Sequence, residues 1–306
     1  MDNITDINYI QKLLKNSIPD LNIAINEPMK NHTSFKIGGD ADVFVKPKSE
    51  EEIVSALSLI KENNIPLTVI GNGSNLLVSD KGIEGVVLCI GKEFSGTHTD
   101  GTRIYAKAGT LLSRVANAAL ASSLTGMEFA SGIPGSLGGA LVMNAGAYGG
   151  EMKDITESTR YINANGDICE CVGEEHCFGY RKSRFTRDDV ILSAVLNLKE
   201  GNSTEIKNEM NELNEKRRDK QPLEYPSAGS TFKRPEGYFA AKLIDDAGLR
   251  GYRIGDAMVS EKHCGFVINA GEATCSQVTE LMEYVKGVVM DKFGVTLEPE
   301  VRLLGR

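Results

Sequence analysis

Ser131-Gly132-Ile133-Pro134-Gly135-Ser136-Leu137-Gly138-Gly139-Ala140 is the stretch that decides the fold, and a second glycine-rich stretch, Val69-Ile70-Gly71-Asn72-Gly73-Ser74-Asn75-Leu76-Leu77, precedes it. Glycine adopts positive φ and lets backbone N–H groups approach a ligand without a Cβ in the way. Successive N–H groups in such turns bind anions such as a diphosphate. Neither stretch is a P-loop or a complete Rossmann fingerprint. The pattern suggests a dinucleotide held by another architecture, although tight turns between strands explain such glycines equally well.

Alternating strand and helix patterns around these stretches predict a mixed α+β chain. Ser49 with Glu52 is a capping box before one helix, and Thr110 and Thr274 are expected to cap two others. An Asn165-Gly166 turn predicts a hairpin. The expected strands are residues 41–45, 67–70, 86–90, 103–108, 158–162, 167–172, 190–198 and 301–304. The expected helices begin near residue 7, after Ser49 and Thr110, near residue 206, at residue 238 and at residue 277.

A polar turn at residues 200–203 and a charged helix end at residues 215–222 indicate a boundary. We therefore expect an N-terminal helix and approach segment at residues 1–32. A first domain then covers residues 33–199 and a second covers residues 200–306. Catalytic chemistry is expected between two such lobes.

Composition excludes several classes of protein. The chain has 306 residues, with 34 Lys plus Arg against 42 Asp plus Glu and a formal net charge of −8, which disfavours nucleic-acid binding. No apolar run reaches the ~18 residues of a membrane span. The first residues lack the pattern of a signal peptide. Six cysteines are too few for a disulfide framework at this length, which predicts a cytoplasmic protein.

A small cysteine cluster raises the question of zinc. Cys169-Glu170-Cys171 is followed by His176-Cys177. The C-x-C spacing is not the usual zinc spacing, and residues 168–172 alternate as a strand does. We expect no metal.

The glycine-rich stretches begin a series of motifs. Asn144-Ala145-Gly146-Ala147-Tyr148-Gly149 follows, then Gly179-Tyr180-Arg181-x-Ser183-x-Phe185, Ser227-Ala228-Gly229-Ser230-Thr231-Phe232-Lys233 and Leu297-Glu298-Pro299-Glu300-Val301. In this order they resemble the UDP-N-acetylenolpyruvoylglucosamine reductase family, from about residue 31 to the C-terminus. The resemblance implies reduction of UDP-N-acetylglucosamine enolpyruvate in peptidoglycan precursor synthesis.

The resemblance also implies a fold and two cofactors. The fold is a vanillyl-alcohol-oxidase (PCMH) type of FAD-binding domain of two α+β subdomains, followed by an α+β substrate-binding domain. FAD is expected to be non-covalent, because the four histidines lie outside the glycine loops, and NADPH is the hydride donor. The residues expected to bind FAD are Gly71, Asn72, Gly73, Ser74, Asn75, Leu76, Gly132, Pro134, Gly135, Ser136, Gly138, Gly139, Asn144, Gly146 and Ala147.

Three residues match the family's catalytic positions. Hydride addition to the enolpyruvyl group puts negative charge on its carboxylate and requires a proton at the neighbouring carbon. Arg181 suits the carboxylate, because a guanidinium stays charged and binds it bidentately. Ser230 matches the proton donor, and Glu300 matches the third position, where it orients Arg181 or shares a donor network. Without the resemblance, a surface arginine is the favoured interpretation of Arg181, and a turn cap is an equal alternative for Ser230. An exposed strand carboxylate is the alternative for Glu300.

Four further residues are expected to contact the substrate: Tyr148, Tyr180, Lys233 and Arg234. Core packing is the alternative for each tyrosine. Arg234 stands where many relatives carry Asn, so polar contacts there differ. The span from Arg181 to Ser230 is too short for the extra tyrosine-bearing loop of the longer subtype. This resembles the shorter, type II form.

Two other functions fit part of the pattern. One is an oxidase or dehydrogenase on the same fold, although the Ser230 block argues against it. The other is a non-catalytic module that binds a UDP-sugar, which would carry no yellow cofactor. In each case the partner is a small molecule, and we expect a monomer with neither nucleic acid nor membrane as partner.

Overall fold

The computed structural model describes residues 6–306, which form two compact units. Unit 1 contains the chain up to Asn26 together with Asp42–Asn72 and Gly85–Arg217. Unit 2 contains Glu27–Ala41, Gly73–Glu84 and Arg218–Arg306. Residues 1–5, on which the expected lack of a signal peptide partly depends, lie outside the described residues. The units interleave in sequence, and the division into ligand-binding domains at residues 33 and 200 stays a prediction.

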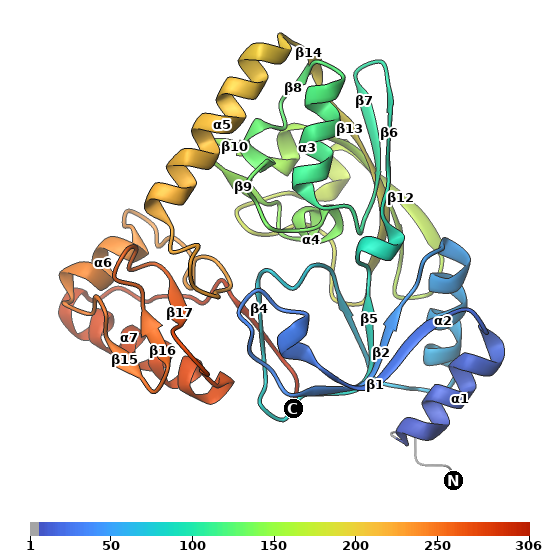
Figure 1. The fold of residues 1–306 in the computed structure, drawn as a ribbon, viewed down its shortest axis with the longest axis horizontal. Helices are drawn as coiled ribbons and strands as arrows, with labels where there is room; N and C mark the ends of the chain where they lie inside the picture. Colours follow the sequence, from blue (N-terminus) through green and yellow to red (C-terminus); the bar gives the residue numbers. More distant parts are fainter. Residues whose placement is uncertain (1–5) are drawn as a thin grey trace. The chain divides into compact units, whose positions relative to one another are not determined.

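Two main sheets form the framework of unit 1 (Figure 1). One has the order β1-β2-β5-β3, in which β3 and β5 run parallel. The other has the order β12-β11-β13-β7-β6 and is antiparallel throughout. Their strands are β1 (Asn22–Pro28), β2 (Asp40–Lys46), β3 (Leu67–Ile70), β5 (Ile83–Cys89), β6 (Thr97–Asp100), β7 (Arg103–Lys107), β11 (Thr156–Ile162), β12 (Ile168–Val172) and β13 (Val190–Asn197). β1 ends in unit 2, and β2 and β5 begin there.

Helices and short strands complete unit 1. The helices are α1 (Ile7–Ser17), α2 (Glu50–Glu62), α3 (Leu112–Ala121), α4 (Leu137–Val142) and α5 (Ser203–Lys220). α1 packs on α2, and α3 packs against β6 and β7 (Figure 1). The remaining strands form the pairs β8 (Leu124–Thr125) with β14 (Lys199–Glu200) and β9 (Gly146–Ala147) with β10 (Gly150–Glu151).

Unit 2 is smaller and is built mainly on the longest helix of the described chain. This helix, α7 (Cys275–Phe293), packs on α6 (Ala240–Asp246) and on the strands β15 (Arg253–Ile254) and β16 (Ala257–Val259). These two strands form an antiparallel sheet with β17 (Val267–Asn269). β4 (Leu76–Val78) pairs in parallel with β18 (Arg302–Leu304). This pairing ties the second glycine-rich stretch to the C-terminal end of the chain.

Each unit buries its own apolar core. The core of unit 1 includes Ile53, Leu88 and Ile104, all with less than 2% of their surface exposed. The core of unit 2 includes Val278 and Leu281 of α7, both completely buried. Burial of each such side chain contributes about 1.5–3 kcal/mol to folding. The expected mixed α+β class is therefore confirmed.

The local signals were mostly confirmed, with two corrections. Ser49 caps α2 by accepting the Glu52 N–H, but the Glu52 carboxylate accepts from the amide of Lys48 instead of that of Ser49. Thr110 does not cap α3, because its hydroxyl exchanges hydrogen bonds with the backbone of Gly96. The Thr110 hydroxyl therefore binds the backbone of Gly96 instead of the first amides of the helix. Thr274 does cap α7, in a capping box with Gln277.

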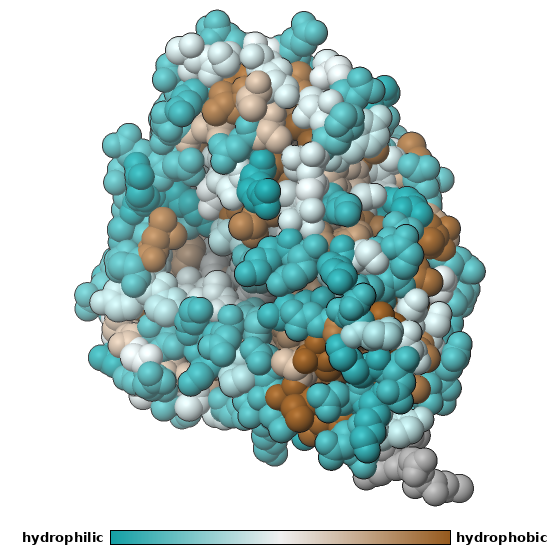
Figure 2. Space-filling model, turned by 45° about the vertical axis from the view of Figure 1, so that its right-hand side comes forward, coloured by the Kyte–Doolittle hydropathy of each residue, from teal (hydrophilic) through white to brown (hydrophobic). Residues whose placement is uncertain are grey.

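Polar residues predominate on the molecular face shown in Figure 2, with apolar residues in separate patches. Among residues 6–306, no helix combines the length and the apolarity needed to cross a bilayer.

Asp80 fastens the β4 loop to α7 within unit 2. Its carboxylate accepts from the amide of Cys275 at 2.7 Å, and from the amide and hydroxyl of Ser276 at 2.9 and 2.7 Å. Partial burial opposes ionisation, but these hydrogen bonds outweigh it and hold the pKa of Asp80 below its ordinary value. The ionised carboxylate also lies at the positive end of the helix dipole.

We predict that Asp80→Ala destabilises unit 2 by about 2 kcal/mol at pH 7, the scale of hydrogen bonds to a charged group. A carboxyl group whose pKa is lower in the folded state stabilises the fold at pH values above its unfolded pKa of about 3.9. This contribution to stability is lost as the pH falls through the folded pKa. The difference between wild type and variant should therefore shrink in acid. Urea unfolding at pH 7 and pH 3 measures it, with exposed Glu84→Ala as the control. If the difference in the free energy of unfolding between wild type and Asp80→Ala were the same at both pH values, the ionised Asp80 carboxylate would not be the group that caps α7.

Candidate active site

The two glycine-rich stretches meet within unit 1. Residues 69–77 continue from the end of β3, and residues 131–140 lead into α4. A Cβ on Gly71 would lie 2.4 Å from the Oγ of Ser136, so only glycine fits here without displacing that hydroxyl. The Asn72 side-chain amide donates to the carbonyl of Pro134. These contacts join loops that lie more than sixty residues apart in the sequence.

Ser136 provides an unsatisfied polar atom at this junction. The residue is 2% exposed, and its hydroxyl has no hydrogen-bond partner among residues 6–306. Burying a hydroxyl without a partner is costly, so a bound group is expected to satisfy it. A Cβ on Gly139 would approach the same hydroxyl at 3.8 Å. A buried hydroxyl without a partner, placed between Gly71 and Gly139 where backbone approaches closely, is the feature of these loops that fits a bound dinucleotide such as FAD.

Several of the predicted FAD-binding residues also make contacts within the protein, and their binding of FAD stays a prediction. The Gly138 amide donates to the Ala108 carbonyl at 2.9 Å, and a Cβ there would lie 3.1 Å from that of Ala108. The Gly135 carbonyl accepts from the amide of Leu112. Gly73 belongs to unit 2, where its φ of +65° and a Cβ only 1.9 Å from the His32 carbonyl require glycine. These glycines shape the loops through backbone packing.

Asn144 likewise uses its side chain to fix the chain. The amide donates to Glu151 Oε2 at 2.9 Å and to the Gly179 carbonyl at 3.1 Å. Its oxygen accepts from the amide of Lys153 at 2.9 Å. With 1% exposure, Asn144 holds the β9–β10 hairpin and the segment before Arg181 together.

That hairpin presents an exposed tyrosine. Gly146 and Ala147 form β9, and the two-residue turn to β10 consists of Tyr148 and Gly149, with φ of +53° and +95°. Positive φ at both positions is typical of a type I′ turn. Tyr148 is 47% exposed at its tip, so core packing, the alternative reading of this residue, does not apply.

Arg217 of α5 lies beside this region and was missed in the sequence. The Arg217 Cδ would be 3.2 Å from a Cβ on Gly132. Tyr148 is close enough to Arg217 to affect the pKa of the guanidinium. Burial lowers the pKa of Arg217, an effect that Tyr148 partly opposes, and no carboxylate pairs with it among residues 6–306. A half-buried guanidinium without a counter-ion is suited to an anionic ligand. Its position in a run of charges at a helix end suggested only a linker.

Arg181 reaches the same hairpin. Its guanidinium donates to the Gly146 carbonyl at 3.4 and 3.5 Å and lies 5.4 Å from the ring centre of Tyr180. Tyr180 is 51% exposed, so it too is not a core residue. Arg181 has a φ of +53°, an uncommon conformation for a side chain of this size. Local strain of this kind clusters at functional sites.

Unit 2 brings the other two predicted catalytic residues into adjacent segments. The amide of Glu300 donates to the Thr231 carbonyl at 2.8 Å, and that of Lys233 donates to the Glu298 carbonyl at 2.8 Å. Ser230 is exposed at the start of its segment, and Glu300 is half-buried. The Asn75 side chain donates to the Glu300 carbonyl at 3.1 Å, so Asn75 supports the Glu300 segment through its backbone.

The remaining predicted residues of unit 2 lie along the same segments. Ser74 precedes Asn75, and Leu76 begins β4. Lys233 pairs with Glu298 at 3.0 Å. The Arg234 guanidinium stacks 4.0 Å from the ring centre of Phe239, which is 60% exposed.

His176 serves the core of unit 1. Its ring nitrogens lie 2.9 Å from the Thr159 hydroxyl and 2.8 Å from the Gly173 carbonyl, and the residue is fully buried. Burial lowers its pKa. Both nitrogens are therefore occupied by the protein. Among residues 6–306, no group of three or more His, Cys, Asp or Glu side chains could hold a metal ion.

Comparison with known proteins adds the family. The family model for an FAD binding domain matches residues 41–172. The model for the C-terminal domain of UDP-N-acetylenolpyruvoylglucosamine reductase matches residues 221–304. The expected combination of an FAD-binding domain and a second domain is confirmed.

Full-length relatives extend this likeness over nearly the whole chain. UDP-N-acetylenolpyruvoylglucosamine reductase of Caldanaerobacter subterraneus is 52% identical over 95% of this chain and 97% of its own. That of Clostridioides difficile is 52% identical over 95% of this chain and 96% of its own. The crystal structure of the reductase from Thermus caldophilus aligns with a TM-score of 0.79 and 35% identity, covering 92% of this chain and 98% of its own.

The orphaned hydroxyl leads to a test. Ser136→Ala should weaken FAD binding about fivefold to tenfold, the effect of losing one hydrogen bond, while thermal stability is unchanged or slightly raised because a buried unsatisfied group is removed. Titration of FAD into flavin-free protein, followed by fluorescence, measures the affinity. Ser122→Ala, at an exposed serine after α3, is the control. Unchanged affinity in Ser136→Ala would show that Ser136 does not contact the cofactor.

Proposed function

Because this chain belongs to the UDP-N-acetylenolpyruvoylglucosamine reductase family, we propose that it reduces UDP-N-acetylglucosamine enolpyruvate to UDP-N-acetylmuramate, with NADPH as reductant and FAD as cofactor. The observation that carries the proposal is 52% identity over 95% of the chain with a reductase of that name. The product is a precursor of peptidoglycan, which connects the reaction to cell-wall synthesis, cell shape and division.

FAD would be held in unit 1 by the junction of the glycine loops. The unsatisfied Ser136 hydroxyl and its close approach to Gly71 support this placement. Bound FAD would accept a hydride from NADPH and deliver it to the enolpyruvyl group. We assign residues 33–199 to FAD binding and residues 200–306 to substrate binding.

The carboxylate of the substrate requires a cationic partner. Charge develops on it as hydride arrives, and a preorganised guanidinium stabilises such charge strongly in a closed site. Arg181 is our assignment, supported by its strained backbone beside the β9–β10 hairpin. Arg217 and Tyr148 are further candidates for the negatively charged part of a ligand, because both present polar groups at one place in unit 1.

A proton must reach the substrate carbon next to the one that receives hydride. We assign this step to the exposed hydroxyl of Ser230. A serine is a weak acid, but a strongly basic carbon needs only a well-placed proton. Glu300 lies in the adjacent segment, from which its carboxyl group would orient the donor network. Tyr180, Lys233 and Arg234 are assigned to the sugar and phosphates of the substrate.

We further propose that the protein acts as a cytoplasmic monomer. UDP-sugars and NADPH are charged small molecules, and the single chain carries all assigned catalytic residues. Light scattering of the purified protein tests the oligomeric state.

An anaerobic titration separates the proposed activity from the two alternatives. A yellow protein that is bleached by NADPH and recoloured by the enolpyruvyl UDP-sugar has the proposed activity. A colourless protein that binds the UDP-sugar would be a binding module. A yellow protein recoloured only by oxygen would be an oxidase.

The role of Ser230 can be tested in each half of the reaction. Ser230→Ala should be bleached by NADPH at nearly the normal rate, because this half needs no proton at carbon. Recolouring by the substrate should slow about 10²–10⁴-fold, the typical contribution of a positioned acid. Ser230→Cys retains a proton and should recover part of the rate. Stopped-flow absorbance measures both halves, and equal slowing of the two would assign Ser230 a structural role.

A further inference from the structure

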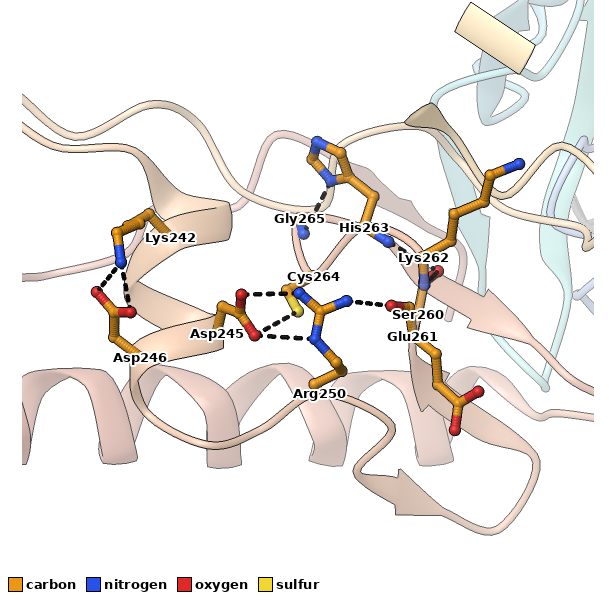
Figure 3. A network of polar contacts seen from close by, with 10 residues as sticks. All are labelled: Lys242, Asp245, Asp246, Arg250, Ser260, Glu261, Lys262, His263, Cys264 and Gly265. Carbon is orange, nitrogen blue, oxygen red and sulfur yellow. Dashed lines mark hydrogen bonds and ion pairs between the residues drawn. The ribbon is translucent and has the colours of Figure 1, made fainter. Parts of the chain in front are cut away.

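A polar network in unit 2 (Figure 3) contacts the segment that follows Ser230, through a hydrogen bond between Gly265 and Thr231. It centres on the turn of residues 260–266, which joins β16 to β17. The buried Ser260 hydroxyl accepts from the amides of Lys262 and His263 at 3.2 and 3.3 Å. The His263 ring accepts from the amide of Gly265 at 3.1 Å. The turn is therefore held in one conformation by its own side chains.

This turn holds Thr231, the neighbour of Ser230. The Thr231 amide donates to the Gly265 carbonyl at 2.8 Å, and its hydroxyl accepts from the amide of Val267 at 2.8 Å. Thr231 is 4% exposed. A displacement of the 260–266 turn would therefore be transmitted directly to the backbone that carries the Ser230 hydroxyl.

Arg250 fixes the turn to helix α6. Its guanidinium binds the Asp245 carboxylate through two nitrogens, at 2.9 and 2.7 Å. The remaining terminal nitrogen donates to the backbone carbonyl of Glu261, within the turn. Figure 3 shows Arg250 between these two partners. The planar guanidinium allows this geometry, which an ammonium group does not reproduce.

Cys264 adds a second connection to Asp245. Its thiol donates to Asp245 Oδ1 at 3.5 Å. Burial raises the pKa of Cys264 to about 11, so the thiol keeps its proton at neutral pH. Asp245 thus receives donors from the turn itself and from Arg250.

The network fixes the position of the 260–266 turn and contributes little to the free energy of unfolding. The side chains of Arg250 and Asp245 are 46% and 41% exposed, and exposed ion pairs contribute little to stability. However, Gly265 packs tightly, because a Cβ there would lie 2.9 Å from the His263 ring and 3.2 Å from Ala241 of α6. The turn has little room to shift while Arg250 is in place.

We propose that Arg250 and Asp245 are positioning residues for proton donation, which set the location of the Ser230 hydroxyl through the 260–266 turn and Thr231. This inference rests on the proposed role of Ser230. Small misplacements of a catalytic group cost large factors in rate. The network should therefore affect the half of the reaction that consumes a proton and leave hydride transfer from NADPH unaffected.

The test compares Arg250→Met with a matched control on α6, the helix to which Arg250 binds. Lys242 forms an exposed ion pair with Asp246, four residues away on α6, at 2.6 Å. Figure 3 shows this pair pointing away from the turn. Lys242→Met therefore removes a similar cation and ion pair without touching the turn.

In Arg250→Met, recolouring by the substrate should slow about tenfold, while bleaching by NADPH keeps its rate. Hydrogen–deuterium exchange at the Thr231 amide, measured without substrate or NADPH, should accelerate. Arg250→Lys should recover part of both effects, because an ammonium can contact one partner but not hold both in the same geometry. Lys242→Met should match wild type in all three measurements.

The outcomes separate this inference from the proposed function. Slow recolouring in Ser230→Ala with normal recolouring in Arg250→Met would overturn the inference alone. Normal recolouring in Ser230→Ala would remove Ser230 as the donor, and the inference with it. Equal slowing of both halves in Arg250→Met, or unchanged exchange at Thr231, would also overturn the positioning role.

Discussion

The backbone of Thr231 is the constraint on which the catalytic part of unit 2 depends. Its amide is bound by Gly265, its carbonyl by the Glu300 amide and its hydroxyl by Val267. Three segments distant in sequence thus meet at one buried residue. A buried backbone must satisfy its hydrogen-bonding groups, so these segments can separate only at a substantial cost in free energy. This junction places the exposed Ser230 hydroxyl on a rigid support.

Unit 1 achieves the same rigidity with glycine and with loop amides. Gly138 packs against Ala108, and Asn144 joins the hairpin to the segment before Arg181. These polar groups of the loops therefore form hydrogen bonds within the protein. Among residues 6–306, the Ser136 hydroxyl of these loops and the nearby Arg217 guanidinium of α5 have no hydrogen-bond partner, and they are correspondingly informative. In the proposed function, these two groups contact the ligand.

Regular elements could be predicted from the sequence because their signals are local. The capping box at Thr274 and the Asn165-Gly166 turn require only neighbouring residues, and both are present. Thr110 does not cap α3, because its hydroxyl binds the backbone of Gly96, fourteen residues earlier in the chain. Loop contacts depend on partners brought together by the whole fold, so no local pattern can give them.

The candidate site divides in the same way. Ser230 and Glu300 were identified by resemblance, and their adjacent placement follows only from the pairing of their segments. Gly73 carries the same motif signal as Gly71, yet it avoids a collision with the His32 carbonyl within unit 2. A glycine motif therefore identifies a loop, but it does not separate the glycines that face a ligand from those that permit the turn. That distinction requires coordinates.

The unsatisfied groups also connect stability to ligand binding. A buried hydroxyl without a partner and a desolvated guanidinium each lower the free energy of unfolding. A ligand that binds only the folded state restores this free energy, by an amount that grows with its concentration relative to its dissociation constant. Selection for stability alone would replace Ser136 with alanine and give Arg217 a carboxylate partner. The proposed anionic cofactor and substrate would supply the missing contacts of both groups.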